Sequence, residues 1–203
     1  MSPQRRRSAD GRGASDHRRS PARGGGRLRL SSGEFRGRLL RVGKGLRPTE
    51  GRVREALFSI WRPALEGCRF LDLFAGSGAL ALEAEGLGAL EVLAVDHRTE
   101  DLIHNLDRVG SRAVKALQGS LPEILAQAPA ERFDRVFADP PYEFSDYPGL
   151  IAAVEPWLAK DGEAAFEHSR RRDLPAAVAG LLRVDRRHYG ETSLSFYRHG
   201  PAT

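Results

Sequence analysis

Residues 70–80 read Phe-Leu-Asp-Leu-Phe-Ala-Gly-Ser-Gly-Ala-Leu, and this stretch decides the fold. The mostly apolar run at its start predicts a buried strand, the two glycines predict a tight turn, and Ala79 and Leu80 begin a helix. Glycines let a backbone approach a ligand closely, and open α/β sheets bind ligands beyond the carboxyl ends of their strands. We therefore expect a cofactor site at this turn.

The turn alone does not identify the cofactor. Gly76, Gly78 and Ala81 also satisfy the dinucleotide fingerprint, and Asp96 follows about 20 residues after the turn, where an acidic residue binds ribose hydroxyls. NAD and S-adenosylmethionine are both compatible with this pattern. A further motif is needed to separate them.

Outward from the turn, short apolar runs alternate with helical patterns, which predicts an α/β fold with a mostly parallel sheet and helices on both faces. Two strand-like runs at the end, 182–189 and 192–198, are joined by Gly190-Glu191 and predict an antiparallel hairpin. The expected parallel strands are 69–75, 91–96, 113–118, 133–138 and 162–168, and the expected helices lie near 77–87, 99–109, 121–128 and 146–159.

The front of the chain differs in composition and charge. Residues 1–62 carry a net charge of +12, whereas residues 63–203 carry −7. A basic front of this kind is typical of proteins that bind nucleic acid, because phosphate neutralisation dominates that affinity. We expect a disordered basic tail over 1–26, a small β-hairpin and an amphipathic helix over 27–62, and the catalytic domain over 63–203.

The single cysteine, Cys68, excludes an internal disulfide framework and is consistent with a reducing compartment. No apolar run approaches the roughly 20 residues that cross a bilayer. No cluster of cysteine or histidine has metal-ligand spacing, so we expect no metal. The sequence therefore predicts a cytoplasmic protein without a membrane partner, and we expect a monomer.

A second motif, Asp139-Pro140-Pro141-Tyr142, follows the expected strand 133–138. Two prolines could simply end a strand, but here they stand at the sheet edge that already carries the glycine turn. An exocyclic base amine is a poor nucleophile, and acceptors that hold both of its hydrogens favour the geometry needed for attack. The Asp139 carboxylate and the Pro140 carbonyl could hold that amine while Tyr142 stacks on the base, once the base has left any stack.

Taken together, the motifs resemble the RsmD-type family of bacterial 16S ribosomal RNA guanine-N2 methyltransferases. The resemblance covers about residues 27–198 and depends on three blocks, which are Arg47-Pro-Thr49 with 52–58, Asp72-Leu-Phe-Ala-Gly-Ser-Gly78, and Asp139-Pro-Pro-Tyr142. It implies a Rossmann-like class I methyltransferase with a seven-stranded sheet and S-adenosyl-L-methionine as the methyl donor. The implied partner is 16S ribosomal RNA or a small ribosomal subunit assembly intermediate.

The resemblance also implies roles for particular residues. Around the methyl donor these are Asp72, Ala75, Gly76, Ser77 and Gly78 beside the methionine part, Asp96 at the ribose, and His97 and Ser120 at the adenine. The catalytic set is Asp139, Pro140 and Tyr142, and the arginines expected to contact RNA are Arg36, Arg38, Arg47, Arg52, Arg170 and Arg171. Two positions depart from the family pattern, since Gly51 replaces an acidic residue and Gly119-Ser120 replaces an Asp or Asn.

Three other functions remain compatible with parts of the sequence. An adenine-N6 methyltransferase acting on DNA or RNA would use the same Asp-Pro-Pro-Tyr chemistry, and the block that begins at Arg47 disfavours it. An NAD-dependent oxidoreductase fits the glycine turn but neither that motif nor the terminal hairpin. A non-enzymatic RNA-binding assembly protein is consistent with the basic front alone.

Overall fold

The computed structural model describes residues 26–43, 48–126 and 132–201 of the 203-residue chain. Apart from Gly26, the tail expected over 1–26 lies outside the described residues, as does Arg47. None of the helices in the described ranges is long and apolar enough to span a membrane.

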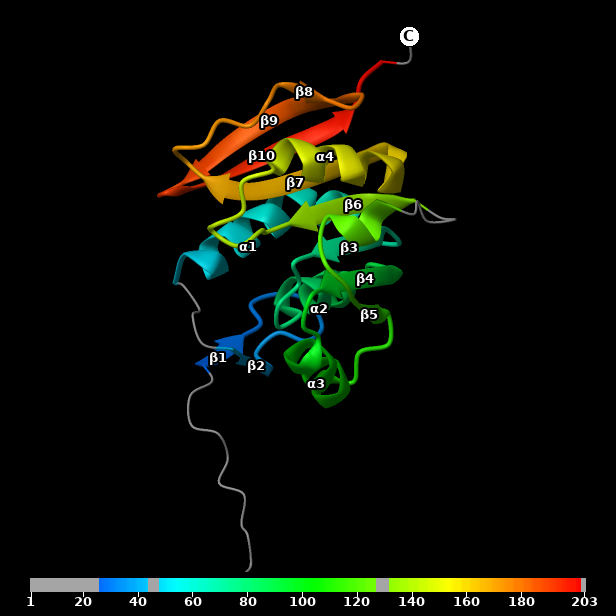
Figure 1. Cartoon of the computed structure of the whole chain (residues 1–203). Coiled ribbons are helices and arrows are strands. Elements are labelled where there is room, and N and C mark those ends of the chain that lie inside the picture. The colour runs from blue at the N-terminus through cyan, green and yellow to red at the C-terminus, as the bar shows by residue number, and fades with distance from the viewer. Residues whose placement is uncertain (1–25, 44–47, 127–131, 202–203) are drawn as a thin grey trace, which may run out of the picture.

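A mixed sheet of eight strands runs through the middle of the molecule in the order β5-β4-β3-β6-β7-β10-β9-β8 (Figure 1). Neighbours from β5 to β7 pair in parallel, and those from β7 to β8 pair antiparallel. The strands are β3 (Arg69–Leu73), β4 (Glu91–Asp96), β5 (Val114–Gln118), β6 (Phe133–Ala138), β7 (Leu158–Ser169), β8 (Ala177–Val178), β9 (Leu181–Tyr189) and β10 (Thr192–His199).

The chain order produces a switch point at β3. After β3 the chain adds β4 and β5 on one side, and it then returns to add β6 on the other side. The connections on the two sides of β3 therefore diverge and leave a crevice beyond the carboxyl ends of β3 and β6. The two motifs identified in the sequence both follow these strands.

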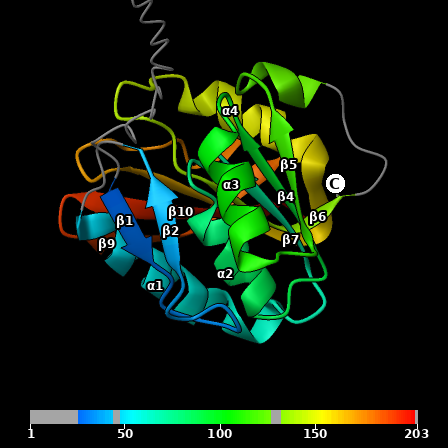
Figure 2. The same ribbon diagram turned by 90° about the horizontal axis from the view of Figure 1, so that it is seen from below.

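Helices cover both faces of the sheet (Figures 1 and 2). One core cluster combines side chains from α1 (Pro48–Trp61), α2 (Ala79–Gly86) and α3 (Glu100–Val109) with one side of the sheet. The opposite cluster combines α4 (Tyr147–Val154) and the 3-10 turns Glu123–Ala126 and Glu155–Trp157 with the other side. Because strand side chains alternate, Phe70 packs in the first cluster and Leu71 in the second.

A separate two-stranded hairpin, β1 (Gly26–Arg29) and β2 (Leu39–Val42), packs against α2 and α3. Its side chains Leu30, Phe35 and Leu40 form a third apolar cluster with residues of these helices. At one point the backbones nearly touch, since a Cβ on Gly33 would lie 2.5 Å from the carbonyl carbon of Gly86. Gly33 also has a φ of +72°, so this contact requires glycine on both counts.

Most of the expected elements are present, and the differences concern their ends. The helix expected over 146–159 ends as α4 at Val154, and β7 begins at Leu158 rather than at 162. The helix expected near 121–128 is a 3-10 turn as far as Ala126, and residues 127–131 lie outside the described part of the chain. The sheet has one strand more than the expected seven, because the two-residue β8 pairs with β9.

Candidate active site

A cleft of about 690 Å³ opens at the carboxyl edge of the sheet. The residues expected to bind cofactor or to act in catalysis contribute seven of its lining side chains or turns, namely Asp72, Ala75, Gly76, Ser77, Asp96, His97 and Asp139. The structure therefore brings together segments that are separated by up to 67 positions in the sequence. The N-terminal hairpin closes the cleft from another side with Leu28, Arg41, Val42 and Gly43.

Asp72 lies at the floor of the cleft, near the end of β3. Its side chain is buried, and its Oδ2 accepts a hydrogen bond of 3.1 Å from the backbone N–H of Ala81 in the first turns of α2. Burial raises the pKa of Asp72 well above its usual range, and the nearby charges of Asp139 and Asp96 raise it further. Asp72 thus joins the strand to the helix that follows the glycine turn.

The glycine turn has the backbone geometry that its sequence predicts. Gly76 and Gly78 have φ of +53° and +77°, and Phe74 also has a positive φ, +64°. Gly76 is exposed toward the cleft, whereas Gly78 is buried at the start of α2 and is not part of the lining. A Cβ on Gly78 would collide with the side chain of Leu102, so this glycine allows α2 and α3 to approach.

Asp96 fixes the shape of this turn from the end of β4. Its Oδ2 accepts a hydrogen bond of 2.8 Å from the Gly76 N–H, and its Oδ1 accepts one of 2.9 Å from the Arg98 N–H. The Nδ1 of His97 lies 2.8 Å from the same Oδ1. Each carboxylate oxygen can accept more than one hydrogen bond, so Asp96 can hold the turn and still face a hydroxyl in the cleft.

The Asp-Pro-Pro-Tyr motif forms a corner directly after β6. The Asp139 N–H is 3.4 Å from the Leu73 carbonyl, which keeps the corner beside the end of β3. Asp139 lines the cleft, Pro140 is buried, and Tyr142 is 71% exposed. The carboxylate thus faces the same space as the glycine turn, while the tyrosine side chain is exposed on the surface.

Aromatic rings connect the corner to the glycine turn. Phe144 contacts Phe74 with ring centroids 5.8 Å apart and Tyr147 with centroids 5.3 Å apart. The Arg172 guanidinium lies 5.1 Å from the Tyr147 ring centroid, and its Nη1 donates to the Ser145 carbonyl at 3.3 Å. These contacts hold the loop after Asp139 against both neighbouring segments.

Two buried polar residues connect the N-terminal part to the cleft. The Asn105 side chain from α3 accepts from the Arg41 N–H at 2.8 Å and donates to the Arg41 carbonyl at 2.7 Å and to the Ser77 carbonyl at 2.9 Å. Glu83 accepts from the Nε of Arg54 at 2.9 Å. Sequence reasoning missed both Asn105 and Arg54, and a polar residue at a core-facing helical position is the signal that could have found them.

The arginines expected to contact RNA occupy three places. Arg36 and Arg38 are exposed between β1 and β2, Arg52 is exposed on α1, and Arg170 and Arg171 are exposed just after β7. Ser120, expected at the adenine, is exposed after β5 and is not part of the cleft lining. Its role stays a prediction.

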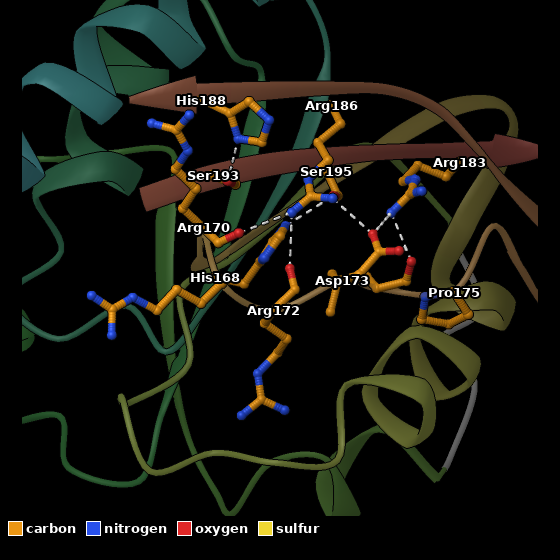
Figure 3. A network of polar contacts seen from close by, with 12 residues as sticks. His168, Arg170, Arg172, Asp173, Pro175, Arg183, Arg186, His188, Ser193 and Ser195 are labelled. Atoms are coloured by element: carbon orange, nitrogen blue, oxygen red, sulfur yellow. Dashed lines mark hydrogen bonds and ion pairs between the residues drawn. The ribbon is translucent and has the colours of Figure 1, made fainter. Parts of the chain in front are cut away.

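The loop that carries Arg170 and Arg171 is held from β9 (Figure 3). Arg186 donates to Asp173 Oδ1 at 2.7 Å and to the backbone carbonyls of Arg170 and Arg172 at 3.2 and 3.0 Å. Arg183 donates to the same carboxylate oxygen at 2.9 Å. The loop backbone is thus fixed on its inner side, with the side chains of Arg170 and Arg171 exposed.

The described residues contain no group of three or more His, Cys, Asp or Glu that could hold a metal ion. The cleft is lined by carboxylates, guanidinium groups, backbone groups and aromatic rings. Six carboxylates line it, those of Asp72, Asp96, Glu100, Asp101, Asp139 and Glu167. Three arginines, Arg41, Arg54 and Arg98, also line the cleft. Because the carboxylates outnumber them six to three, the cleft favours a ligand that donates hydrogen bonds or carries positive charge.

Known proteins show clear similarity to this chain. A family model described as Conserved hypothetical protein 95 matches residues 28–198. Ribosomal RNA small subunit methyltransferase D of Escherichia coli (strain K12) is 31% identical over 182 residues, which cover 86% of this chain and 91% of that protein. A solved structure of yhhF from Escherichia coli has a TM-score of 0.79 at 31% identity and covers 87% of this chain and 100% of its own. SMU.776, solved in complex with SAH, has a TM-score of 0.66 at 14% identity, covers 88% of this chain and 57% of its own, and shows similarity of fold alone.

Proposed function

The chain belongs to the family described as Conserved hypothetical protein 95, and from this membership we propose that it transfers a methyl group from S-adenosylmethionine to the exocyclic N2 of one guanine in 16S ribosomal RNA of the small subunit. One observation carries the proposal. Asp139 of the Asp-Pro-Pro-Tyr corner lines the same cleft as the glycine turn and Asp96. A donor and an acceptor amine can therefore meet in a single space.

The cleft has the groups that S-adenosylmethionine requires. A Cβ on Gly76 would meet only the Phe74 carbonyl oxygen, at 4.0 Å, so the turn leaves room for a ligand. Asp96 stands where ribose hydroxyls can donate to it, and the carboxylates of the lining complement the positive charge of a sulfonium and an ammonium group. His97, whose side chain is exposed beside Asp96, is available to an adenine ring.

In this site the residues of the chain act mainly by positioning. When bound, the donor supplies a methyl group on a positively charged sulfur, which is already a good leaving group. The Asp139 carboxylate and the Pro140 carbonyl accept hydrogen bonds from the guanine amine, and Tyr142 stacks on the base after it has left the RNA stack. Correct orientation of two reactants can lower a barrier by roughly 7 kcal/mol or more.

The remaining parts of the proposal concern organisation and setting. We propose that residues 27–62 form an RNA-contacting arm on a catalytic domain over 63–203, with Arg36, Arg38, Arg52, Arg170 and Arg171 meeting RNA phosphates. Arg47 and the tail over 1–26 belong to the same proposal on the basis of sequence. A monomer working in the cytoplasm, on 16S ribosomal RNA or an assembling small subunit, is consistent with this organisation.

Replacement of Asp139 tests the proposal. Asp139→Ala should bind S-adenosylmethionine within about 3-fold of the wild type, because the cofactor contacts remain, but should lose methylation of small-subunit RNA by about 100-fold or more. Asp161→Ala, which removes an exposed carboxylate near the start of β7 and outside the cleft lining, is the matched control and should keep wild-type activity. Calorimetry measures cofactor binding, and methyl incorporation measures the rate.

Mapping of RNA methylation identifies the product. Small-subunit RNA from cells without the protein should lack one guanine-N2 methyl group that returns with the wild-type gene and not with Asp139→Ala. If the missing methyl group maps to an adenine, the protein is an adenine-N6 methyltransferase and the guanine-N2 assignment is wrong. Wild-type rates in Asp139→Ala would contradict the role of the corner.

A further inference from the structure

A second carboxylate, that of Glu167, faces the acceptor side of the cleft. Glu167 lies near the end of β7 and is half-buried. It lines the cleft together with Phe137 and Asp139 of the neighbouring segment. The mechanism proposed above does not use it.

Strand register places Glu167 beside Asp139. In the parallel pair β6 and β7, Ala138 is the partner of Phe166, so the next residues along the two chains are Asp139 and Glu167. Phe166 and Ala138 are both buried in the core cluster under α4. Because side chains alternate, Asp139 and Glu167 turn together to the opposite face, the face of the cleft.

The backbone at Glu167 is fixed by Tyr147. The Tyr147 hydroxyl donates to the Glu167 carbonyl at 3.1 Å. Burial raises the pKa of Tyr147 to about 12, and although Arg172 lowers that pKa, the charges of Asp139 and Glu167 both raise it. The phenol therefore stays a donor, and both carboxylates lie close enough to one ring to influence it.

Guanine and adenine present different hydrogen-bonding groups to the carboxylates of Asp139 and Glu167. Guanine presents two donors side by side, the N1–H and the N2 amine, whereas adenine presents its N6 amine beside an N1 that is an acceptor. One carboxylate can accept from the amine while a second accepts from N1–H. An adenine in the same position would turn its N1 lone pair toward the second carboxylate, which is repulsive.

We propose that Glu167 is the residue that selects guanine, by accepting a hydrogen bond from N1–H while Asp139 and Pro140 hold the N2 amine. This inference rests on the proposed methyl transfer and adds the group that distinguishes the two purines. It makes Glu167 a substrate-contacting residue, whose carboxylate accepts one hydrogen bond from the base.

Glu167→Gln tests the assignment, because an amide of the same shape can turn an N–H toward N1. The substrate is small-subunit RNA in which the mapped guanine is either retained or replaced by 2-aminopurine, which keeps the N2 amine but has an acceptor at N1. Wild type should prefer guanine, since 2-aminopurine leaves the carboxylate facing a lone pair. Glu167→Gln should lose about 10- to 100-fold in kcat/KM on guanine and gain relative to wild type on 2-aminopurine.

Glu143→Gln is the matched control, since it removes an exposed carboxylate from the neighbouring loop that is not part of the cleft lining. It should leave the ratio of kcat/KM for guanine to that for 2-aminopurine unchanged. Calorimetric binding of S-adenosylmethionine and thermal unfolding verify that both variants are folded. A purely structural role of Glu167 would lower the rate on both bases equally.

The outcomes separate the inference from the function on which it rests. Equal losses on guanine and 2-aminopurine in Glu167→Gln, or an unchanged preference for guanine, would overturn the assignment while wild-type methylation of guanine stands. If the wild type fails to methylate the RNA in which the guanine is retained, the proposed function itself is overturned. A changed ratio in Glu167→Gln alone supports selection through N1.

Discussion

At the scale of single residues, His168 shows how burial controls ionisation. Its side chain is buried, and its ring nitrogens lie 2.8 Å from the Ser195 Oγ and 2.9 Å from the Ser169 carbonyl oxygen. Burial lowers the pKa of His168 to about 4. Since an unfolded histidine has a pKa of about 6.5, the unfolded chain takes up a proton first as the pH falls.

The stability contributed by neutral His168 should therefore be present above pH 6.5 and be lost as the pH falls from about 6.5 to about 4. His168→Asn cannot take up this proton. The difference in unfolding free energy between wild type and His168→Asn, measured by urea denaturation, should shrink by about 3 kcal/mol between pH 7 and pH 4. A flat result for His168 would contradict the lowered pKa.

Residues that sequence reasoning located are those whose role depends on local position. Asp72 lies within a predicted strand, Asp96 ends one and Asp139 follows one, and parallel strands bring their carboxyl ends to one edge. Asn105 and Arg54 could not be assigned in this way, because their hydrogen-bond partners are 64 and 29 positions away. Such partners depend on how helices and hairpin pack, which local pattern does not encode.

At the scale of elements, the turns were predicted more accurately than the ends of the helices and strands. The terminal hairpin was expected from Gly190-Glu191 and is formed by β9 and β10, with Gly190 at a φ of +63°. The length of the helix after Asp139 was overestimated, because the expected helix was continued through Pro156, whereas α4 ends at Val154 and Glu155–Trp157 forms a 3-10 turn. A proline disfavours the helical conformation of the residue before it and removes a backbone donor, so it marks a helix boundary.

The loop after β7 is held in place by Arg186. Arg186 makes three hydrogen bonds that fix this loop, and a lysine there would keep the charge without the guanidinium geometry. Arg186→Lys should speed amide hydrogen exchange over residues 170–174 and weaken RNA binding several-fold, because Arg170 and Arg171 lose their fixed position. Arg187→Lys, on the same strand with an exposed ion pair to Asp185, should do neither. Faster hydrogen exchange with unchanged RNA affinity would show that the RNA does not depend on Arg170 and Arg171.

At the scale of the whole molecule, charge is divided between the two ends of the chain. The positive charge of residues 1–62 belongs to a segment that contributes Leu28, Arg41, Val42 and Gly43 to the cleft, where carboxylates outnumber arginines six to three. An anionic polymer is therefore attracted to the basic segment more strongly than to the interior of the cleft. This division favours a flexible base entering the cleft while the phosphates stay outside it.

The affinity for RNA should consequently depend on salt, whereas the affinity for S-adenosylmethionine should change little. Each phosphate contact on single-stranded RNA contributes a slope of about −0.7 in a plot of log affinity against log salt. Arg36→Gln with Arg38→Gln should make that slope shallower by about 1 to 1.5 if both arginines contact phosphates. Titrations at several potassium chloride concentrations measure both ligands, and an unchanged slope would remove these arginines from the RNA surface.

The two-residue strand β8 also affects how copies of the protein meet. It pairs with Leu181 and Leu182 only, and four of the next five residues of β9, from Arg183 to Arg187, are charged. Arg183 and Arg186 are further engaged by the loop that lies along this margin. A strand from another molecule would have to bury ionised side chains in order to pair here. Crowded solutions of the folded protein should thus resist growth of the sheet into fibrils from this side.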